Sequence, residues 1–209
     1  LQLCSNDNMQ IMNCTTPANY FHALRRQMHS DFRKPLVIMT PKSLLRHKHC
    51  ISQIEEFSKK NSFHRILWDH AMDPKTKGFI ELKKPKKIKK VILCSGKIYF
   101  DLLEAREKMK RNDVVFYRIE QLYPFPAKTL VKELKPYAKN AYFYWCQEEP
   151  KNMGAWFSVR DYIQWTLDSI KANNNEISNK GRSPEASQAT GYAKRHISQQ
   201  EEIIKKVFE

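Results

Sequence analysis

A helix is predicted near the start of the chain by the spacing of apolar residues after a capping residue. Thr16 can accept a hydrogen bond from a free backbone N–H at a helix start, and Pro17 then occupies the first helical position, where its missing N–H costs nothing. Apolar residues follow at steps of three and four: Phe21, Leu24 and Met28. This spacing predicts one buried helical face.

Apolar runs on both sides of this helix predict two strands. Residues 9–12 (MQIM) form the first run, and residues 36–39 (LVIM) form the second, directly after Pro35. Runs without polar alternation are typical of parallel strands that are covered on both faces. The first forty residues therefore predict a strand–helix–strand unit.

Residues 40–90 have a different pattern, with three prolines, many charges and a modest apolar period. The period predicts a helix near 51–60, followed by an irregular connector. The connector ends in KKPKKIKK (83–90), which holds six lysines in eight residues. We expect the best domain boundary of the chain here. The predicted division is 1–72, then a basic linker at 73–90, then a second domain at 91–209.

The second half repeats the alternation of strand and helix. Apolar runs predict strands at 91–94, 114–119 and 141–146. Helices are predicted at 98–110, at 127–134, along Trp156, Val159, Ile163 and Leu167, and in an amphipathic tail with Ile197, Ile203, Ile204 and Val207. The polar stretch 171–179 predicts a loop. The expected fold is α/β, with a largely parallel sheet and helices on both faces, preceded by a partial strand–helix–strand unit of a second α/β domain.

Composition narrows the class of protein. The 209 residues are 41% hydrophobic, which is enough for a core, and no apolar run approaches the roughly 18 residues that span a bilayer. We therefore expect no membrane partner. Five scattered cysteines without a CxxC pair favour reduced thiols over a disulfide framework. The chain starts with LQLC and has no signal-peptide pattern, so we expect it to begin partway through a longer protein.

The net charge of +15 makes a polyanion partner a hypothesis to weigh. The lysine run at 83–90 contains neither aromatic residues nor arginines, which nucleic-acid binders often interleave with lysines. The run is therefore interpreted as a solvated basic linker, with a polyanion-binding patch as the alternative. A basic nucleic-acid-binding α/β module remains the alternative function, and a salt titration of DNA binding would distinguish it.

Three local patterns could carry chemistry, but each has an ordinary structural explanation. Ser95-Gly96-Lys97 follows a predicted strand. It could bind an anion and so make the chain a stand-alone small-molecule binder, or it could be an ordinary turn between a strand and a helix. His47, His49 and Cys50 match no common zinc spacing, so no metal site is predicted. Glu148 and Glu149 follow a strand, but adjacent residues of an extended segment point to opposite sides. The residues alone predict no active site.

Several stretches resemble one family, in the right order along the chain. TPANYFHALRRQ (16–27) and KPLVIMTPKSLLRH (34–47) look like the end of the pyrimidine-binding domain of 2-oxoglutarate dehydrogenase decarboxylating components. CSGKIYFDL (94–102), RIEQLYPFP (118–126) and CQEEPKNMGAW (146–156) resemble landmarks of the transketolase-like C-terminal domain. GRSPEASQATGY (181–192) resembles the family's near-terminal GR-x-x-SAS-PA-x-GY segment, with Glu185 and Gln188 in less usual positions.

The resemblance implies a parent protein that decarboxylates 2-oxoglutarate, or a close relative such as 2-oxoadipate, and passes the succinyl group to lipoamide in the tricarboxylic acid cycle. It implies thiamine diphosphate and magnesium in that parent. The family's GDG motif occurs nowhere in this chain, and its active-site histidine is expected just before Leu1. We therefore assign no catalytic, cofactor or metal ligand here, and we expect neither cofactor to bind this chain alone.

The resemblance also implies roles for this part of the parent. They are dimerisation, scaffold, and regulation by a nucleotide or acetyl-CoA. Arg26, Lys34 and Lys97 are the candidate regulatory-site residues, although Lys34 stands where the family often has arginine and lacks its fork of donors. The implied partners are a second copy and the lipoyl-bearing succinyltransferase component, and nucleic acid is not among them. The implied location is the bacterial cytoplasm or the mitochondrial matrix.

Overall fold

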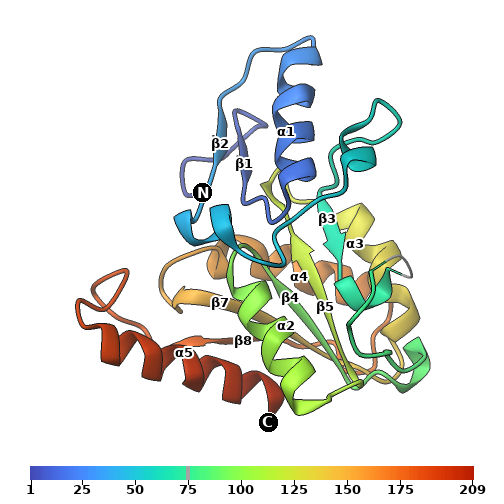
Figure 1. The fold of residues 1–209 in the computed structure, drawn as a ribbon, viewed down its shortest axis with the longest axis vertical. Coiled ribbons are helices and arrows are strands. Elements are labelled where there is room, and N and C mark those ends of the chain that lie inside the picture. The colour runs from blue at the N-terminus through green and yellow to red at the C-terminus, as the bar shows by residue number, and fades with distance from the viewer. Residues whose placement is uncertain (74–75) are drawn as a thin grey trace.

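The computed structural model describes residues 1–73 and 76–209. Its main body is a five-stranded sheet in the order β3-β5-β4-β7-β8, and a second, three-stranded sheet has the order β2-β1-β6. Figure 1 shows the smaller sheet and α1 (Pro17–His29) above the carboxyl ends of the central strands of the larger sheet. The predicted α/β class is confirmed.

The larger sheet is parallel except at one edge. β4 (Lys90–Cys94) lies between β5 (Val114–Ile119) and β7 (Tyr142–Pro150), and β8 (Ile177–Arg182) follows β7, all in parallel. The outer strand β3 (Ile66–Trp68) runs antiparallel to β5. The sequence predicted the three central strands. It did not predict β3, and the loop expected at 171–179 gives way to β8 at its end.

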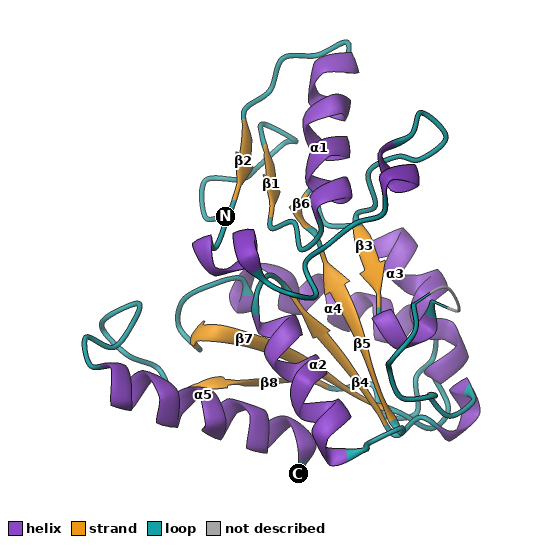
Figure 2. Ribbon diagram, in the orientation of Figure 1, coloured by secondary structure: helices purple, strands orange, loops and turns teal. Residues whose placement is uncertain are grey.

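Helices cover both faces of this sheet, as predicted (Figure 2). Side chains of α3 (Ala127–Leu134) and α4 (Trp156–Ser169) join one core cluster, and side chains of α2 (Ile98–Met109) and α5 (Ala193–Phe208) join the other. The predicted inward residues of α4 are buried, while Ile197 of α5 is exposed. The resulting layers are helix, sheet and helix.

The N-terminal unit is completed by the second half of the chain. β1 (Gln10–Met12) pairs in parallel with β2 (Leu36–Ile38), with α1 (Pro17–His29) between them in sequence. β6 (Gln121–Tyr123), which was not predicted, pairs antiparallel with β1. Buried Glu120 adds polar contacts, because its carboxylate accepts hydrogen bonds from the Thr15 backbone N–H at 2.9 Å and from Asn19 Nδ2 at 2.9 Å. The second half of the chain therefore supplies a strand, β6, to the smaller sheet and also makes buried polar contacts with the N-terminal unit.

Three local predictions are wrong. The run 36–39 is expected to be covered on both faces, but Val37 and Met39 are exposed. The helix expected near 51–60 is only a 3-10 turn, Ile54–Phe57. The predicted buried face of α1 is exposed: Phe21, Leu24 and Met28 all face outward. Ala18 and Ala23 are buried instead, because small side chains let the helix lie close to its sheet. The remaining short elements are the 3-10 helices Lys42–Arg46, His70–Met72, Pro85–Lys87 and Lys135–Tyr137.

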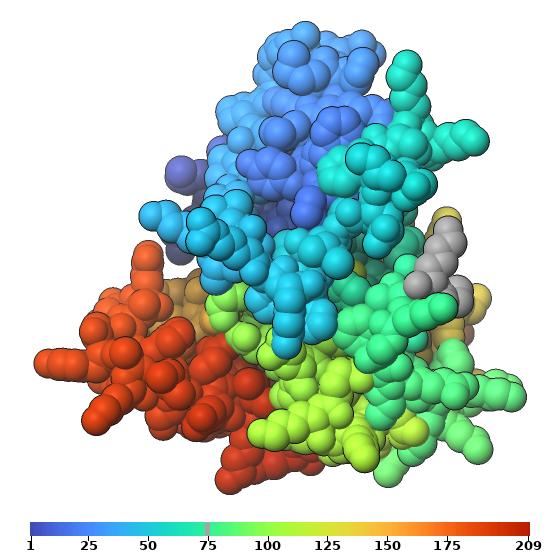
Figure 3. All heavy atoms as spheres, viewed as in Figure 1, coloured from blue at the N-terminus to red at the C-terminus, as the bar shows by residue number. Residues whose placement is uncertain are grey.

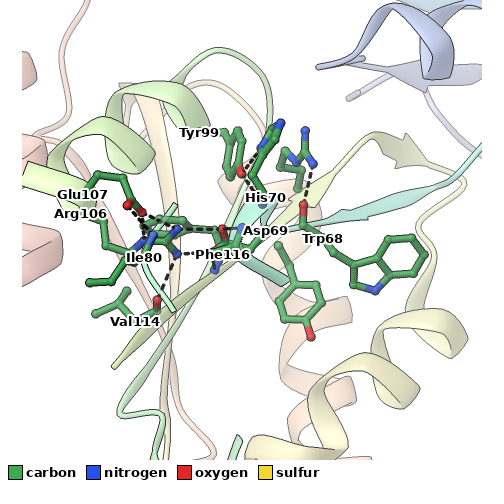
Figure 4. A network of polar contacts seen from close by, with 12 residues as sticks. Trp68, Asp69, His70, Ile80, Tyr99, Arg106, Glu107, Val114 and Phe116 are labelled. Carbon is green, nitrogen blue, oxygen red and sulfur yellow. Dashed lines mark hydrogen bonds and ion pairs between the residues drawn. The ribbon is translucent and has the colours of Figure 1, made fainter. Parts of the chain in front are cut away.

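A buried ion pair joins β3 to α2 and β5 (Figure 4). Asp69 follows β3, and its two carboxylate oxygens accept from both terminal nitrogens of Arg106. One of these oxygens also accepts from the Phe116 backbone N–H at 3.0 Å. Both side chains are fully buried. The predicted linker 73–90 thus comes after a strand that already belongs to the larger sheet, and residues 74–75 of it lie outside the described residues.

Candidate functional site

A pocket of about 410 Å³ lies where the N-terminal unit meets the prolines after β6. Arg26 of α1, Lys34 from the turn before β2, and Arg65 from the segment before β3 all line it. Among its described lining residues, Asp7 is the only carboxylate. Three cations against one anion give the pocket a positive character that favours an anionic ligand.

Arg26 is held in place by two neutral amides. Its Nη2 donates to Gln10 Oε1 at 2.5 Å and to Gln121 Oε1 at 2.7 Å, and its guanidinium carbon lies 4.3 Å from the centre of the Phe63 ring. Burial and the nearby charge of Arg65 lower the pKa of Arg26 to about 10. Neither amide neutralises the charge, so Arg26 is a rigid, still-charged hydrogen-bond donor.

The glutamines are themselves oriented by the backbone. Gln121 Nε2 donates to the Pro124 carbonyl at 2.6 Å, which turns its side-chain oxygen toward Arg26. Gln27 Nε2 donates to the Lys34 carbonyl at 2.7 Å and so fixes the turn that carries Lys34. Side chains that are locked in this way need little reordering when a ligand binds.

Arg65 and Lys34 are the cations of this pocket that remain available. Among the described residues, neither side chain has a hydrogen-bond or ion-pair partner, and the Lys34 ammonium lies 5.3 Å from the centre of the Phe32 ring. The backbone of Arg65 is fixed, because its carbonyl accepts from the N–H groups of Glu120 and Gln121. Cations without counterions at a pocket wall favour phosphate or carboxylate groups.

A second pocket, of about 610 Å³, shares Arg26 and Arg65 with the first. Arg25, Arg26 and Arg65 line it together with three histidines: His22, His29 and His64. Burial, helped by the nearby His22, lowers the pKa of His64. None of its described lining residues is a carboxylate. Both pockets that Arg26 and Arg65 line are therefore positively charged.

Lys97, the third predicted site residue, does not line either pocket. Its ammonium lies 2.7 Å from Asp101 Oδ2 and 2.8 Å from Glu148 Oε1. Burial alone would lower the pKa of Lys97, but these carboxylates outweigh it and raise that pKa. The structure thus brings Arg26 and Lys34 together and leaves Lys97 in a separate, neutralised cluster. Sequence reasoning missed Arg65, and its one signal was the short apolar run that follows it and forms β3.

The other sequence candidates have structural partners. Gly96 has a φ of +76°, and a Cβ there would collide with the Asn13 side chain, so the turn before α2 requires glycine for close approach. The His47 ring packs 4.5 Å from the Phe100 ring, centre to centre. Within residues 1–73 and 76–209 no cluster of His, Cys, Asp or Glu could hold a metal ion. The described residues therefore do not fit a magnesium–diphosphate site.

The fold defines the class of protein first. A solved structure titled "Split gene transketolase, inactive beta4 tetramer" superposes with a TM-score of 0.56, at 12% sequence identity, over 96% of this chain and 56% of that chain. This likeness shows a transketolase-like α/β fold. Residues 51–208 match the family described as "2-oxoglutarate dehydrogenase C-terminal", and residues 1–48 match "Transketolase, pyrimidine binding domain". The chain belongs to the 2-oxoglutarate dehydrogenase C-terminal family.

Curated relatives are similar along almost the whole chain. The "2-oxoglutarate dehydrogenase E1 component" of Brucella abortus (strain S19) is 57% identical over 199 residues, which are 95% of this chain and 20% of that protein. The protein of the same name from Brucella ovis is 56% identical over the same shares. This chain spans about a fifth of the length of these relatives. Among the described helices, none is long and apolar enough to cross a membrane.

Proposed function

We propose that this chain forms the C-terminal part of a thiamine-diphosphate-dependent 2-oxoglutarate dehydrogenase component. The parent decarboxylates 2-oxoglutarate and transfers the succinyl group to lipoamide on its succinyltransferase partner. The observation that carries the proposal is the match of 95% of the chain, at 57% identity, to a protein of that name. Bound thiamine diphosphate, with magnesium, supplies the carbanion chemistry in the parent. The compartment is the bacterial cytoplasm or the mitochondrial matrix.

The contribution of this chain is structural and regulatory. Its larger sheet supports the N-terminal unit through Glu120 and β6, and a second copy completes the assembly. The pocket of Arg26, Lys34 and Arg65 binds the phosphates of a regulatory nucleotide or of acetyl-CoA. Support comes from the fixed Arg26 guanidinium and from the unpartnered side chains of Arg65 and Lys34 at the pocket wall.

A first experiment tests the division of labour. The purified chain is titrated with thiamine diphosphate and magnesium in a calorimeter and assayed for decarboxylation of 2-oxoglutarate. We expect neither binding nor turnover, because the described residues offer no metal cluster and the sequence has no GDG motif. Clear turnover by this chain alone would refute the proposal.

A second experiment tests the pocket. The chain is titrated with ADP and with acetyl-CoA, before and after Arg65→Gln and Lys34→Gln. Loss of one charge-assisted hydrogen bond costs about 1.5–3 kcal/mol, so each substitution should weaken binding by about tenfold or more. Lys97→Gln is the matched control, since Lys97 is already paired with two carboxylates and should leave affinity unchanged. Equal losses in all three variants would contradict the assignment of the site.

A further inference from the structure

The lysine run before β4 belongs to a larger basic surface, which we name the lysine edge. It consists of exposed lysines from three segments: Lys83, Lys84, Lys86, Lys87 and Lys89 before β4, Lys108 and Lys110 at the end of α2, and Lys135 and Lys139 after α3. The segment around 83–89 lies at the lower right rim in Figure 3, with side chains extending from it. The run at 83–89 is visible in the sequence. That the lysines at the end of α2 and after α3 lie on the same surface is visible only in the fold.

The three segments are tied together, so the lysine edge is a fixed surface and the run is not a loose linker. Ile88, in the middle of the run, is only 2% exposed and belongs to the main core. The Lys83 backbone N–H donates to the Asn112 carbonyl at 2.9 Å. Asn140 Nδ2 donates to the Lys86 carbonyl, also at 2.9 Å. These contacts hold the start of β4 against the turns before β5 and β7.

The charges of the lysine edge are not compensated within the described chain. Among the ion pairs of the described residues, none involves these nine ammonium groups. Lys108, Lys110 and Lys135 lie at the C-terminal ends of α2 and α3, where the free carbonyls favour cations by about 0.3–1 kcal/mol each. The five lysines before β4 belong to no α-helix, so this local explanation does not extend to them. Their mutual repulsion favours an external anion.

The chemistry of the lysine edge points to a carboxylate-rich partner. Its neighbouring arginine, Arg111, is already bound to Asp113 Oδ1 at 2.9 Å and to the Phe208 carbonyl at 3.0 Å, so the surface offers ammonium groups as its free donors. The run has no aromatic side chain for base stacking. Its one isoleucine is buried and cannot insert into lipid. Ammonium groups pair readily with single carboxylates, which need no fork.

We propose that the lysine edge is a docking surface for an acidic polypeptide segment of another protein. The lysine edge lies at the amino ends of β4, β5 and β7. The N-terminal unit and the pocket of Arg26, Lys34 and Arg65 lie toward the carboxyl ends of these strands. A partner can therefore occupy it without covering the pocket. This proposal does not depend on the nucleotide site or on the activity of the parent protein. It can therefore fail while those proposals stand, and they can fail while it stands.

The test compares two triple variants that change the net charge equally. Lys84→Glu, Lys86→Glu and Lys87→Glu alter the lysine edge, and Lys42→Glu, Lys59→Glu and Lys60→Glu alter lysines that are also exposed but lie elsewhere. Binding of a labelled polyglutamate peptide is followed by fluorescence anisotropy at low salt, with circular dichroism as the check of folding. We expect the first variant to weaken binding by about tenfold and the second by about twofold or less.

Two further probes identify the class of partner. Duplex DNA and vesicles of phosphatidylserine and phosphatidylcholine are titrated at the same ionic strength as polyglutamate. Tighter binding to polyglutamate, with a loss confined to the lysine-edge variant, supports the proposal. Equal losses in both variants would mean that only net charge matters, and the proposal would be overturned. Tighter binding to DNA or to vesicles would overturn it as well.

Discussion

At the residue scale, buried charged side chains constrain the fold most strongly, and the sequence pattern does not reveal them. Burial alone would lower the pKa of Arg106, but Asp69 outweighs it and raises that pKa. Asp69 also accepts from two backbone N–H groups, those of Ala71 and Phe116. Asp69 thus holds together α2 through Arg106, β5 through Phe116, and the turn that contains Ala71. Because the contacts with Arg106 and Phe116 join distant parts of the sequence, no local motif could have predicted them.

We expect Asp69→Asn to destabilise the protein strongly. The substitution removes one of the two carboxylates that pair with the fully buried Arg106 and leaves only that of Glu107, and breaking a buried pair costs about 3–5 kcal/mol. Urea denaturation measures the change in the free energy of unfolding. Asp161→Asn is the control, because Asp161 pairs with Arg160 at the surface with its side chain 80% exposed, and it should cost about 0.5 kcal/mol or less. Similar losses in both variants would contradict the role of the buried pair.

His70 gives the fold a dependence on pH. Burial and the neighbouring Arg118 lower the pKa of His70 to about 3, and its ring nitrogen Nδ1 lies 2.5 Å from the Tyr99 hydroxyl. An unfolded histidine takes up its proton near pH 6.5, whereas the folded one resists it. Stability that is fully present above about pH 6.5 is therefore lost as pH falls toward 3.

This loss should reach about 1–2 kcal/mol at about pH 5, relative to neutral pH. Urea denaturation at the two pH values measures it. His49 and His64 also have lowered pKa values and add to the effect, so the informative quantity is the difference from His70→Gln. Glutamine keeps a hydrogen-bonding partner for Tyr99 but does not titrate, so the variant should lose less stability on acidification. An unchanged pH dependence would show that His70 is not responsible.

At the element scale, periodicity identified the long elements but not the way in which they pack. The central strands and α2, α3 and α4 were predicted from apolar runs and periods, since buried elements must present apolar faces. β3, β6 and β8 were missed because short strands are defined by the strands they pair with, and β8 has the polar sequence ISNKGR. The outward face of α1 was mistaken for a core face, because exposed large apolar residues on a helix have the same spacing as buried ones.

The same limits apply to the candidate site. Arg26 and Lys34 were predicted through family resemblance, and the structure brings both to one pocket. Gln10 and Gln121, which hold Arg26, come from strands far apart in the sequence. Lys97 has the residue type and the position after a strand that favour anion binding, but two carboxylates already pair with it. Partners of this kind become visible only when the fold is known.

Limited trypsin digestion tests the predicted boundary at 73–90. We expect the first cuts within 73–90, as its charged and proline-containing sequence predicts, and within it after exposed Lys77, because Lys83 to Lys89 belong to the fixed lysine edge. The structure adds that the two pieces should stay together, because β3 remains paired with β5 and Asp69 remains bound to Arg106. Gel electrophoresis detects the cut, and gel filtration detects the association. Cuts that fall first within 91–160, or pieces that separate, would contradict this picture.

At the scale of the whole molecule, the N-terminal unit exposes apolar residues on the outer face of α1 and at its open strand edge. Leu24 is 45% exposed and Met28 76% exposed on the outer face of α1, and Val37 is 40% exposed on β2. β2 is also the open edge of its sheet. Exposed apolar residues next to an unpaired strand edge are uncommon on monomers and are typical of protein contacts. By contrast, Leu36 and Ile38 pack against the small core beneath α1.

We therefore expect the protein to self-associate through the outer face of α1. Light scattering across a concentration series should show a dimer, and the double substitution Leu24→Glu with Met28→Glu should shift it to a monomer, because glutamates on both faces of the contact repel and must be desolvated. Leu45→Glu with Ile54→Glu is the control, since these residues are 85% and 79% exposed on a different segment. The control should leave the dimer intact. A wild-type protein that stays monomeric at high concentration, or a control that dissociates equally, would show that this face is not the interface and that the high positive charge keeps the copies apart.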